Sequence, residues 1–281
     1  LSRAEREMGI ESDVLILSDS YHNYKSDIRI NAPLTPWYSL WKNPINRLKA
    51  FIEVRSDYDV FHFNFGSSLL DYGLINLSLL DLPFYPRDAK IVVTYNGCDA
   101  RQKFPTISRT PFSSCHEPDC YNGQCNSGRK DVIRKKRIEK FSQYADHMFA
   151  LNPDLMWFLP KEKTTFLPYT VDVEPENKVF QNKKEKKEFV IVHAPTNRAC
   201  KGTSYILNVL EKIKNDYENL KCVFIENKTH LETMQILQYA DLVVDQVLTG
   251  WYGGFSTESM TLSKPVIAYI REEEPELLPD G

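Results

Sequence analysis

The sequence predicts an α/β fold made of two doubly wound domains, each with a parallel sheet covered by helices on both faces. Short runs of β-branched and aromatic residues alternate along the chain with stretches whose apolar residues recur at helical spacing. Such alternation is typical of parallel sheets. It is interrupted once by a polar, lysine-rich stretch and then begins again. A length of 281 residues corresponds to roughly two domains. We therefore expect an N-terminal domain over 1–172, a linker over 173–188 and a C-terminal domain over 189–281.

In the N-terminal domain, short apolar runs predict the strands, and apolar residues three or four positions apart predict the helices. The predicted strands are 13–17, 59–65, 89–95, 147–151 and 164–169. The predicted helices are 43–57, 69–80 and 129–144. In the first of these helices, four apolar side chains recur at helical spacing: Ile45, Leu48, Phe51 and Ile52.

The C-terminal domain repeats the same alternation. The predicted strands are 189–195, 221–227, 241–247 and 265–270. The predicted helices are 201–217, 230–239 and 256–262. In such folds, ligands bind at the carboxyl ends of the strands, and a cleft between two domains is a common site.

Composition excludes several classes of protein. The 35 basic and 38 acidic residues give a formal charge of -3, whereas a dedicated nucleic-acid binder would be far more basic. No apolar run reaches the roughly 18 residues that span a bilayer. The first residues of the sequence lack the apolar core of a signal peptide. The six cysteines are not spread like a disulfide framework, so we expect a protein of the reducing cytoplasm.

A basic loop follows the first strand of the C-terminal domain. In HAPTNRACKGT, from His193 to Thr203, the cations Arg198 and Lys201 stand just before a predicted helix. Two cations beside a helix N-terminus, with its unsatisfied amides and positive dipole end, can hold a diphosphate. A solvated basic turn would have the same spacing.

A glycine-rich segment precedes the last predicted helix. In TGWYGGFSTESM, Gly253 and Gly254 allow the backbone to approach a ligand closely. Ser256 and Thr257 open the helix and offer amides and hydroxyls to a phosphate, and Glu258 can accept hydrogen bonds from a ribose. Ordinary connectors also contain Gly-Gly, and an acidic residue in a first helical turn also complements the helix dipole.

Together, the two segments resemble the C-terminal domain of family 4 glycosyltransferases, which have the GT-B fold of two Rossmann-like domains. That family carries an Arg and a Lys-Gly after the first strand of the domain, and further on a Glu-x7-Glu motif that runs into Glu-Ala-Met-Ala-x-Gly-x-Pro-Val. Here the tail reads ESMTLSKPVIAY. The resemblance implies that Arg198 and Lys201 hold the diphosphate of the donor, that Gly253 and Gly254 supply backbone contacts, and that Glu258 binds the nucleotide ribose.

One position departs from this pattern. The first Glu of the pair, which contacts the transferred sugar in the family, corresponds to Gly250 here. This departure keeps two alternatives open beside a glycosyltransferase. One is a non-catalytic nucleotide-sugar-binding or scaffolding subunit, and the other is a nucleotide-sugar epimerase of the same fold.

The N-terminal half resembles the family more loosely. TYNGCDAR is similar to the family pattern His-Gly-x-Asp-x-Arg, with Asn96 in place of His, and it suggests that Asn96, Asp99 and Arg101 lie near the interdomain cleft. His62 ends a predicted strand where the family often has a His. We take Asn96, Asp99 and His62 as catalytic candidates, although a buried structural His and a local Asp99–Arg101 ion pair are alternatives. The segment around Met8 resembles the step before the family's second strand, so we expect the first strand to be missing and the chain to stop before the family's closing helices.

Cysteines cluster in CHEPDCYNGQC. Cys115, Cys120 and Cys125, with His116 beside the first and Cys98 upstream, offer ligands of the kind that structural zinc prefers. The spacing is not that of the usual CxxC pair. The sequence therefore predicts a structural zinc site or a cysteine-stapled loop, with a loop of unpaired cysteines as the alternative.

The resemblance implies a retaining hexosyltransferase that moves a sugar from a nucleotide-diphosphate donor to a glycan or lipid-linked acceptor in polysaccharide or glycolipid biosynthesis. No cofactor is expected for catalysis, because cations and amides stabilise the leaving diphosphate. The basic stretch RKDVIRKKRIEK, over 129–140, could dock on anionic lipid headgroups at the inner membrane surface, or it could be a solvated helix face.

Overall fold

The computed structural model describes residues 2–17, 26–30, 39–72, 77–171 and 188–272. It divides into two compact units, the first formed by residues 1–93 and 139–147 and the second by residues 94–138 and 148–281. The predicted linker, 173–188, lies outside the described residues apart from Glu188. The predicted domain boundaries therefore stay a prediction.

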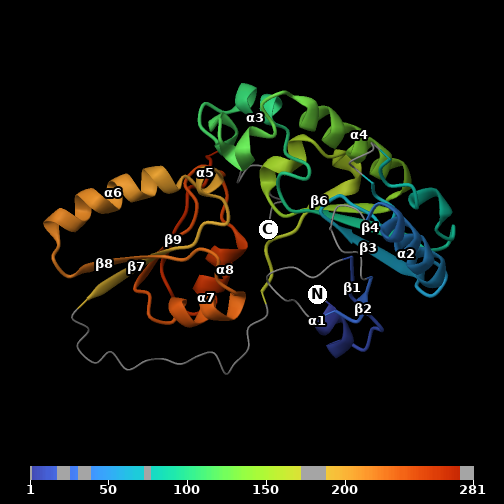
Figure 1. Ribbon diagram of the computed structural model, residues 1–281, viewed down its shortest axis with the longest axis horizontal. Helices are drawn as coiled ribbons and strands as arrows, with labels where there is room; N and C mark the ends of the chain where they lie inside the picture. Colours follow the sequence, from blue (N-terminus) through green and yellow to red (C-terminus); the bar gives the residue numbers. More distant parts are fainter. Residues whose placement is uncertain (1, 18–25, 31–38, 73–76, 172–187, 273–281) are drawn as a thin grey trace. The chain divides into compact units, whose positions relative to one another are not determined.

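The α/β prediction is confirmed (Figure 1). The described residues form two four-stranded sheets, with the orders β3-β4-β5-β6 and β10-β9-β7-β8, and a two-stranded sheet β1-β2. The strands are β1 (Leu15–Ile16), β2 (Ile28–Arg29), β3 (Val60–Asn64), β4 (Lys90–Tyr95), β5 (His147–Ala150), β6 (Thr164–Phe166), β7 (Phe189–His193), β8 (Leu220–Phe224), β9 (Leu242–Val244) and β10 (Val266–Ile267). The pairs β1–β2, β5–β6, β7–β8, β7–β9 and β9–β10 are parallel.

The helices follow the predicted alternation in most places. They are α1 (Ser2–Glu7), α2 (Ser39–Val54), α3 (Lys103–Arg109), α4 (Arg129–Tyr144), α5 (Arg198–Lys201), α6 (Thr203–Asp216), α7 (His230–Leu237) and α8 (Gly254–Thr261). Short 3-10 turns are η2 (Leu82–Phe84), η3 (Ser114–His116), η4 (Cys120–Gly123), η5 (Pro153–Trp157) and η6 (Lys161–Lys163). The bounds of α4 are those that the sequence predicted.

The helix predicted over 69–80 is wrong. The carboxylate of Asp81 accepts a hydrogen bond from the backbone amide of Leu69 at 3.0 Å and also binds the Ser68 hydroxyl. The amide of Leu80 donates to the carbonyl of Leu70 at 3.0 Å. The described parts of this segment, 69–72 and 77–80, are therefore not helical, and Leu69, Leu70 and Leu79 are buried without a helix.

The core of the first unit is aromatic. The ring centroids of Phe51, on α2, and Tyr85 are 5.2 Å apart, and Phe61, on β3, lies 4.3 Å from the same tyrosine. Only part of the predicted apolar pattern of α2 is buried, because Phe51 faces this core while Ile45 and Leu48 are exposed.

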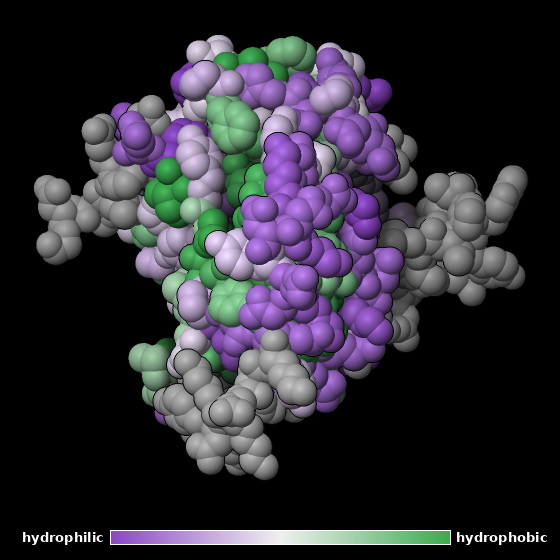
Figure 2. Space-filling model, turned by 90° about the vertical axis from the view of Figure 1, so that its left-hand side faces the viewer, coloured by the Kyte–Doolittle hydropathy of each residue, from purple (hydrophilic) through white to green (hydrophobic). Residues whose placement is uncertain are grey.

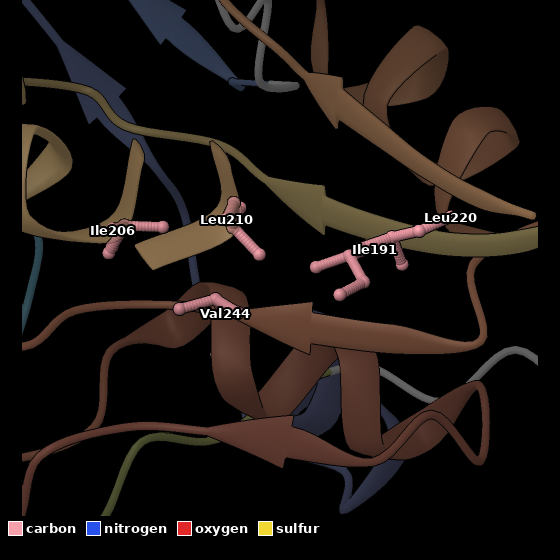
Figure 3. Packing of buried hydrophobic residues seen from close by; sticks show 5 residues of the cluster. All are labelled: Ile191, Ile206, Leu210, Leu220 and Val244. Atoms are coloured by element: carbon pink, nitrogen blue, oxygen red, sulfur yellow. The ribbon is translucent and has the colours of Figure 1, made fainter. Parts of the chain in front are cut away.

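The second unit contains a doubly wound sheet. Figure 1 shows α6 on one side of this sheet and α7 and α8 on the other. Adjacent residues of a strand point to opposite faces. Ile191 accordingly packs with Ile206 and Leu210 of α6 (Figure 3). Its neighbour Val192 packs with Leu237 of α7. Burying each such aliphatic side chain contributes roughly 1.5–3 kcal/mol.

The helix predicted over 201–217 is split at Gly202 into α5 and α6. Gly202 adopts φ 76°, and a Cβ at this position would lie 2.6 Å from Val247. The side chain of Asn197 caps α5 by accepting a hydrogen bond from the amide of Cys200 at 2.9 Å. The short α5 therefore forms a separate helical turn, and it carries both cations of the basic loop, Arg198 and Lys201.

Hydrophilic side chains cover most of the face shown in Figure 2, with smaller hydrophobic areas between them. None of the helices in the described stretches combines the length and the apolar character needed to cross a membrane.

Candidate functional site

The site residues of the second unit lie where the strand order of its sheet reverses. The strands β7 and β9 are parallel neighbours, but β7 leads to β8 on its other side. In doubly wound sheets, this switch point leaves a crevice outside the carboxyl ends of the two strands, where ligands bind. The loop that carries Lys201 follows β7, and Asp245 directly follows β9.

A buried carboxylate joins the two predicted segments. Lys201 Nζ lies 2.6 Å from Oδ1 of Asp245, and the two side chains are 12% and 0% exposed. The other oxygen of Asp245 accepts hydrogen bonds from the amide of Gly253 at 2.9 Å and from Oγ of Ser256 at 2.6 Å. Lys201, Gly253 and Ser256 are thus brought together by Asp245, a residue that sequence analysis did not select.

The charge of this carboxylate is maintained by its partners. Burial by itself would raise the pKa of Asp245, but the Lys201 ammonium and the hydrogen bonds from Lys201, Ser256 and Gly253 lower it below its ordinary value. Asp245 is therefore ionised, and it compensates the charge of a lysine that is itself nearly buried.

Arg198 is exposed and forms an ion pair. Its guanidinium binds the carboxylate of Glu226 in a bidentate manner, with Nε–Oε1 and Nη2–Oε2 distances of 2.8 and 2.5 Å. The hydrogen bond from Arg198 lowers the pKa of Glu226. Because 64% of the Arg198 side chain is accessible, solvent or a ligand can compete with Glu226 for this guanidinium.

Glu258 also has a side-chain partner, which lies close to Glu226 in the sequence. Its Oε1 lies 2.9 Å from Nε2 of His230, the first residue of α7. Glu226 lies in the connection between β8 and α7, and His230 begins α7. The Thr257 hydroxyl donates to the carbonyl of Gly253, with an Oγ1–O distance of 3.4 Å. This hydrogen bond lies within the first turn of α8.

The predicted catalytic residues of the TYNGCDAR segment mainly build a turn. The carboxylate of Asp99 accepts hydrogen bonds from the amides of Asn96 at 2.9 Å and Gly97 at 2.6 Å. Burial raises the pKa of Asp99 despite these hydrogen bonds. In contrast, Oδ1 of Asn96 is buried and has no hydrogen-bond partner among the described residues.

The alternative of a local Asp99–Arg101 ion pair is wrong. Arg101 instead forms a buried, bidentate ion pair with Asp154, with Nε–Oδ2 and Nη2–Oδ1 distances of 2.5 and 2.7 Å. A buried pair of this kind holds the turn after β4 against η5.

His62 lies in the first unit. It lines a cavity of about 160 Å³ together with Asp13 and Tyr58, whose hydroxyl donates to Asp13 at 2.6 Å. Burial lowers the pKa of His62, so the imidazole is neutral at pH 7.

Tyr169 connects Asn96 to the glycine-rich loop. Its hydroxyl lies 3.4 Å from the carbonyl oxygen of Asn96 and 3.3 Å from Nδ2 of Asn152. Its ring centroid is 6.2 Å from that of Tyr252, and a Cβ at Gly254 would lie 3.8 Å from its Cδ1. The catalytic candidate Asn96 and the predicted phosphate-binding loop therefore share one aromatic neighbour.

The position of Arg271 explains why residue 250 is a glycine. Gly250 has φ 87°, and a Cβ there would lie 2.5 Å from the Arg271 guanidinium carbon. This guanidinium donates to the carbonyl of Thr249 at 3.2 Å and stacks over the ring of Trp157 at 5.4 Å. A buried cation thus fills the space that a side chain at position 250 would need.

The cysteines do not support the predicted zinc site. Although Cys98, Cys115, Cys120 and Cys125 all lie in described stretches, no three His, Cys, Asp or Glu side chains of these stretches are placed to hold a metal ion. The Cys125 sulfur accepts a hydrogen bond from Arg134 at 3.3 Å. Cys120, on η4, is a free cysteine. The imidazole of His116 binds Ser113 at 3.0 Å.

Sequence reasoning missed the acidic and basic partners. Asp245, Glu226 and Arg271 carry no motif of their own, and each is identified only by what lies next to it in space. A usable signal for Asp245 was its place directly after a buried strand, where a carboxylate is costly unless it is paired.

Comparisons with known proteins add to this geometry. No protein-family model matches the chain. No curated protein matches it. Among solved structures, it is similar to a sucrose-phosphate synthase from Thermosynechococcus elongatus, with 14% identity, 88% of this chain and 66% of that chain covered, and a TM-score of 0.49.

Two further solved structures are UDP-sugar epimerases. The first is the UDP-GlcNAc 2-epimerase from Neisseria meningitidis, bound to UDP-GlcNAc. Its sequence is 14% identical, the match covers 95% of this chain and 77% of the epimerase, and the TM-score is 0.48. A putative UDP-N-acetylglucosamine 2-epimerase from Listeria monocytogenes has 14% identity, 98% and 75% coverage, and a TM-score of 0.49. At these identities and TM-scores, the likenesses do not assign an activity to this chain.

Proposed function

We propose that this chain is a retaining glycosyltransferase of the GT-B type that takes a sugar from a nucleotide-diphosphate donor. One observation carries the proposal: Lys201, Gly253 and Ser256 converge on Asp245 at the switch point of a doubly wound sheet. The family 4 resemblance of the two segments supports the same assignment.

The arrangement suits a diphosphate leaving group. The Lys201 ammonium has three N–H donors, of which Asp245 takes one. The first amides of α8, at Gly254 and Phe255, have no partner within the helix because a helix begins with unsatisfied donors. Arg198 adds an exposed guanidinium. In the proposed reaction, these cations and dipoles stabilise the charge that develops on the diphosphate as the glycosidic bond breaks.

Asn96 is the proposed contact to the substrate. Its buried Oδ1 lacks a partner among the described residues, and an amide oxygen in that state can accept a hydrogen bond from a sugar hydroxyl. Asp99 then acts through the backbone, by holding the turn from which Asn96 projects.

The proposed acceptor is a glycan or a lipid-linked sugar, and the proposed setting is polysaccharide or glycolipid biosynthesis in the cytoplasm. Arg129 to Lys140 of α4 would provide the contact to an anionic membrane surface.

A thermal-shift panel with UDP, GDP, ADP and TDP tests donor binding. A nucleotide at 100 times its dissociation constant stabilises the folded state by about 2.7 kcal/mol, which raises the melting temperature by several degrees. We expect one nucleotide to do so, and Arg198→Ala to abolish the shift. Lys221→Ala is the control, because Lys221 is also an exposed, ion-paired cation but lies on β8. If no nucleoside diphosphate shifts the melting temperature, the proposal fails.

Incubation with the matching nucleotide sugar then distinguishes the reactions. A transferase releases nucleoside diphosphate faster when an acceptor is added. An epimerase converts the donor sugar without any acceptor, and a binding subunit leaves the donor unchanged. Either of the last two outcomes would contradict glycosyl transfer but would still support a nucleotide-sugar site.

A further inference from the structure

A second buried asparagine adjoins Asn96. Asn96 directly follows β4, and Asn152 follows β5, the neighbouring strand of the same sheet. The amide of Leu151 donates to the carbonyl of Tyr95 at 3.0 Å, which joins the carboxyl ends of the two strands. Nδ2 of Asn152 then donates to the carbonyl oxygen of Asn96 at 3.0 Å. The two asparagines therefore lie side by side at the carboxyl ends of adjacent strands, where doubly wound folds bind their ligands.

The hydrogen bonds of Asn152 fix the orientation of its carboxamide. Nδ2 also lies 3.3 Å from the hydroxyl of Tyr169, so both of its N–H donors have an acceptor. If the carboxamide were turned over, its oxygen would face the carbonyl oxygen of Asn96, and two acceptors would meet. The atom of this side chain that points away from these partners is therefore Oδ1.

This oxygen is buried and unpaired. Asn152 is 2% exposed, and its Oδ1 has no hydrogen-bond partner among the described residues. The same is true of Oδ1 of Asn96. A buried acceptor without a donor is costly, and such groups are rare in folded proteins. A ligand that presents O–H or N–H donors removes this cost, whereas a carboxylate, which only accepts hydrogen bonds, does not.

Tyr169 spans the space between Asn152 and the proposed diphosphate site. Its hydroxyl lies at Asn152, and its Cδ1 would be 3.8 Å from a Cβ at Gly254, the first residue of α8. A Cβ at Gly253 would lie 3.3 Å from Nζ of Lys201. Asn152 is thus separated from the proposed phosphate-binding groups by the length of one tyrosine ring. A hexose has a similar size, and in a nucleotide sugar it is bonded directly to the diphosphate.

We propose that Asn152 is a specificity residue, whose Oδ1 accepts a hydrogen bond from a hydroxyl group of the transferred sugar next to Asn96. The inference rests on the proposed function and adds to it the class of sugar that the site takes. Because both carboxamide oxygens are acceptors, the sugar has to present two donors, as a neutral hexose with free hydroxyl groups does. A sugar without one of these hydroxyls leaves a buried acceptor unpaired and therefore binds more weakly.

Calorimetric titration of the whole chain tests the role of Asn152. Each nucleoside diphosphate of the thermal-shift panel is compared with a hexose conjugate: UDP-glucose, GDP-mannose, ADP-glucose or TDP-glucose. We expect Asn152→Leu, which has a similar volume but no acceptor, to raise the dissociation constant of the preferred conjugate about tenfold. The dissociation constant of the matching nucleoside diphosphate should stay within about twofold, because the diphosphate contacts are unchanged.

Asn126→Leu is the matched control. Nδ2 of Asn126 donates to the carbonyl of Pro118 at 2.8 Å, much as Nδ2 of Asn152 does to that of Asn96. In contrast, Oδ1 of Asn126 already accepts a hydrogen bond from Lys103 at 2.8 Å. We expect this substitution to change neither dissociation constant.

A change in the ligand tests the same contact in the unchanged protein, so the result does not depend on the folding of a variant. Forms of the preferred conjugate are used in which one hydroxyl group at a time is replaced by fluorine, which cannot donate a hydrogen bond. We expect at least one of them to bind about tenfold more weakly than the parent conjugate. In Asn152→Leu, the same replacement should have a smaller effect.

Three results would overturn the inference. The first is an equal loss of affinity for the diphosphate and its conjugate in Asn152→Leu, since a purely structural role produces this. The second is an unchanged affinity for both, and the third is a set of fluorinated conjugates that all bind as tightly as the parent. Each of these leaves nucleotide binding intact and so leaves the proposed function standing. If no nucleoside diphosphate binds at all, the proposed function fails and the inference fails with it.

Discussion

The ammonium of Lys201 lies 2.6 Å from the fully buried carboxylate of Asp245. The lysine follows β7 and the aspartate follows β9, so this ion pair connects the carboxyl ends of two neighbouring strands. Because Asp245 also binds the amide of Gly253 and the hydroxyl of Ser256, it sets the position of the lysine and the glycine-rich loop at once.

Removal of this carboxylate should destabilise the protein strongly. In Asp245→Ala, Lys201 would be left buried without its partner, and two hydrogen-bond donors would lose their acceptor. Breaking a buried pair in this way costs about 3–5 kcal/mol in the free energy of unfolding, which urea denaturation measures. The control is Glu188→Ala, because the Glu188–Lys221 pair is exposed and should contribute less than about 1 kcal/mol. Equal losses for the two variants would contradict the role of Asp245.

Substitution of Gly250 should cost more than substitution of another glycine with a similar backbone. Gly250 and Gly9 have φ values of 87° and 82°, so an alanine adopts a left-handed conformation at either position and loses about 1–2 kcal/mol. At Gly9 there is nothing within 4 Å of the added Cβ, whereas at Gly250 it meets the Arg271 guanidinium. Urea denaturation should therefore show a larger loss for Gly250→Ala, and an equal or smaller loss would rule out the overlap with Arg271.

Glu226 should compete with an anionic ligand for Arg198. We expect Glu226→Gln to tighten the binding of the preferred nucleoside diphosphate roughly twofold to fivefold, because the exposed ion pair that must break is worth about 1 kcal/mol or less. Isothermal titration calorimetry measures the change. The same substitution in an Arg198→Ala background should bring no gain, and a gain there would show that Glu226 acts on another group.

His193 should make stability depend on pH. Its Nδ1 donates to the carbonyl of Val244 at 2.8 Å, so Nε2 of the neutral ring accepts from Thr203 Oγ1 at 2.9 Å. Burial lowers the pKa of His193 below its ordinary value of 6.5. The unfolded chain therefore binds this proton at a higher pH than the folded chain does. The contribution to stability is complete above about pH 6.5 and is lost as the pH falls through the folded-state pKa.

Denaturation curves from about pH 7.5 to about pH 5.5 check this sign. The free energy of unfolding should fall with pH in the unchanged protein and fall less in His193→Gln. His62→Gln is the companion variant, because burial lowers the pKa of His62 too. An undiminished slope in His193→Gln would contradict the assignment.

The sequence predicted the strands and the long helices well because their signal is local. The basic helix α4 has the expected bounds, and β7 is followed by the expected helical stretch. The wrong helix prediction over 69–80 has a specific cause. Asp81 lies just beyond this segment, and its carboxylate accepts a hydrogen bond from the amide of Leu69. A periodic pattern alone does not contain such a tertiary contact.

The candidate site was predictable only in its motif residues. Lys201 and Gly253 were selected from spacing and resemblance, and they do meet at one place. Their common partner Asp245 could not be predicted, because the contact depends on segments that are distant in sequence and adjacent only after folding.

The central claim is that a nucleoside diphosphate binds at the carboxyl ends of β7 and β9. A crystal structure with the nucleoside diphosphate selected by the thermal-shift panel tests it most directly. We expect phosphate oxygens within hydrogen-bond distance of Lys201 Nζ and of the first amides of α8, with Arg198 turned from Glu226 toward the diphosphate. A diphosphate bound away from Lys201 and α8 would contradict the claim.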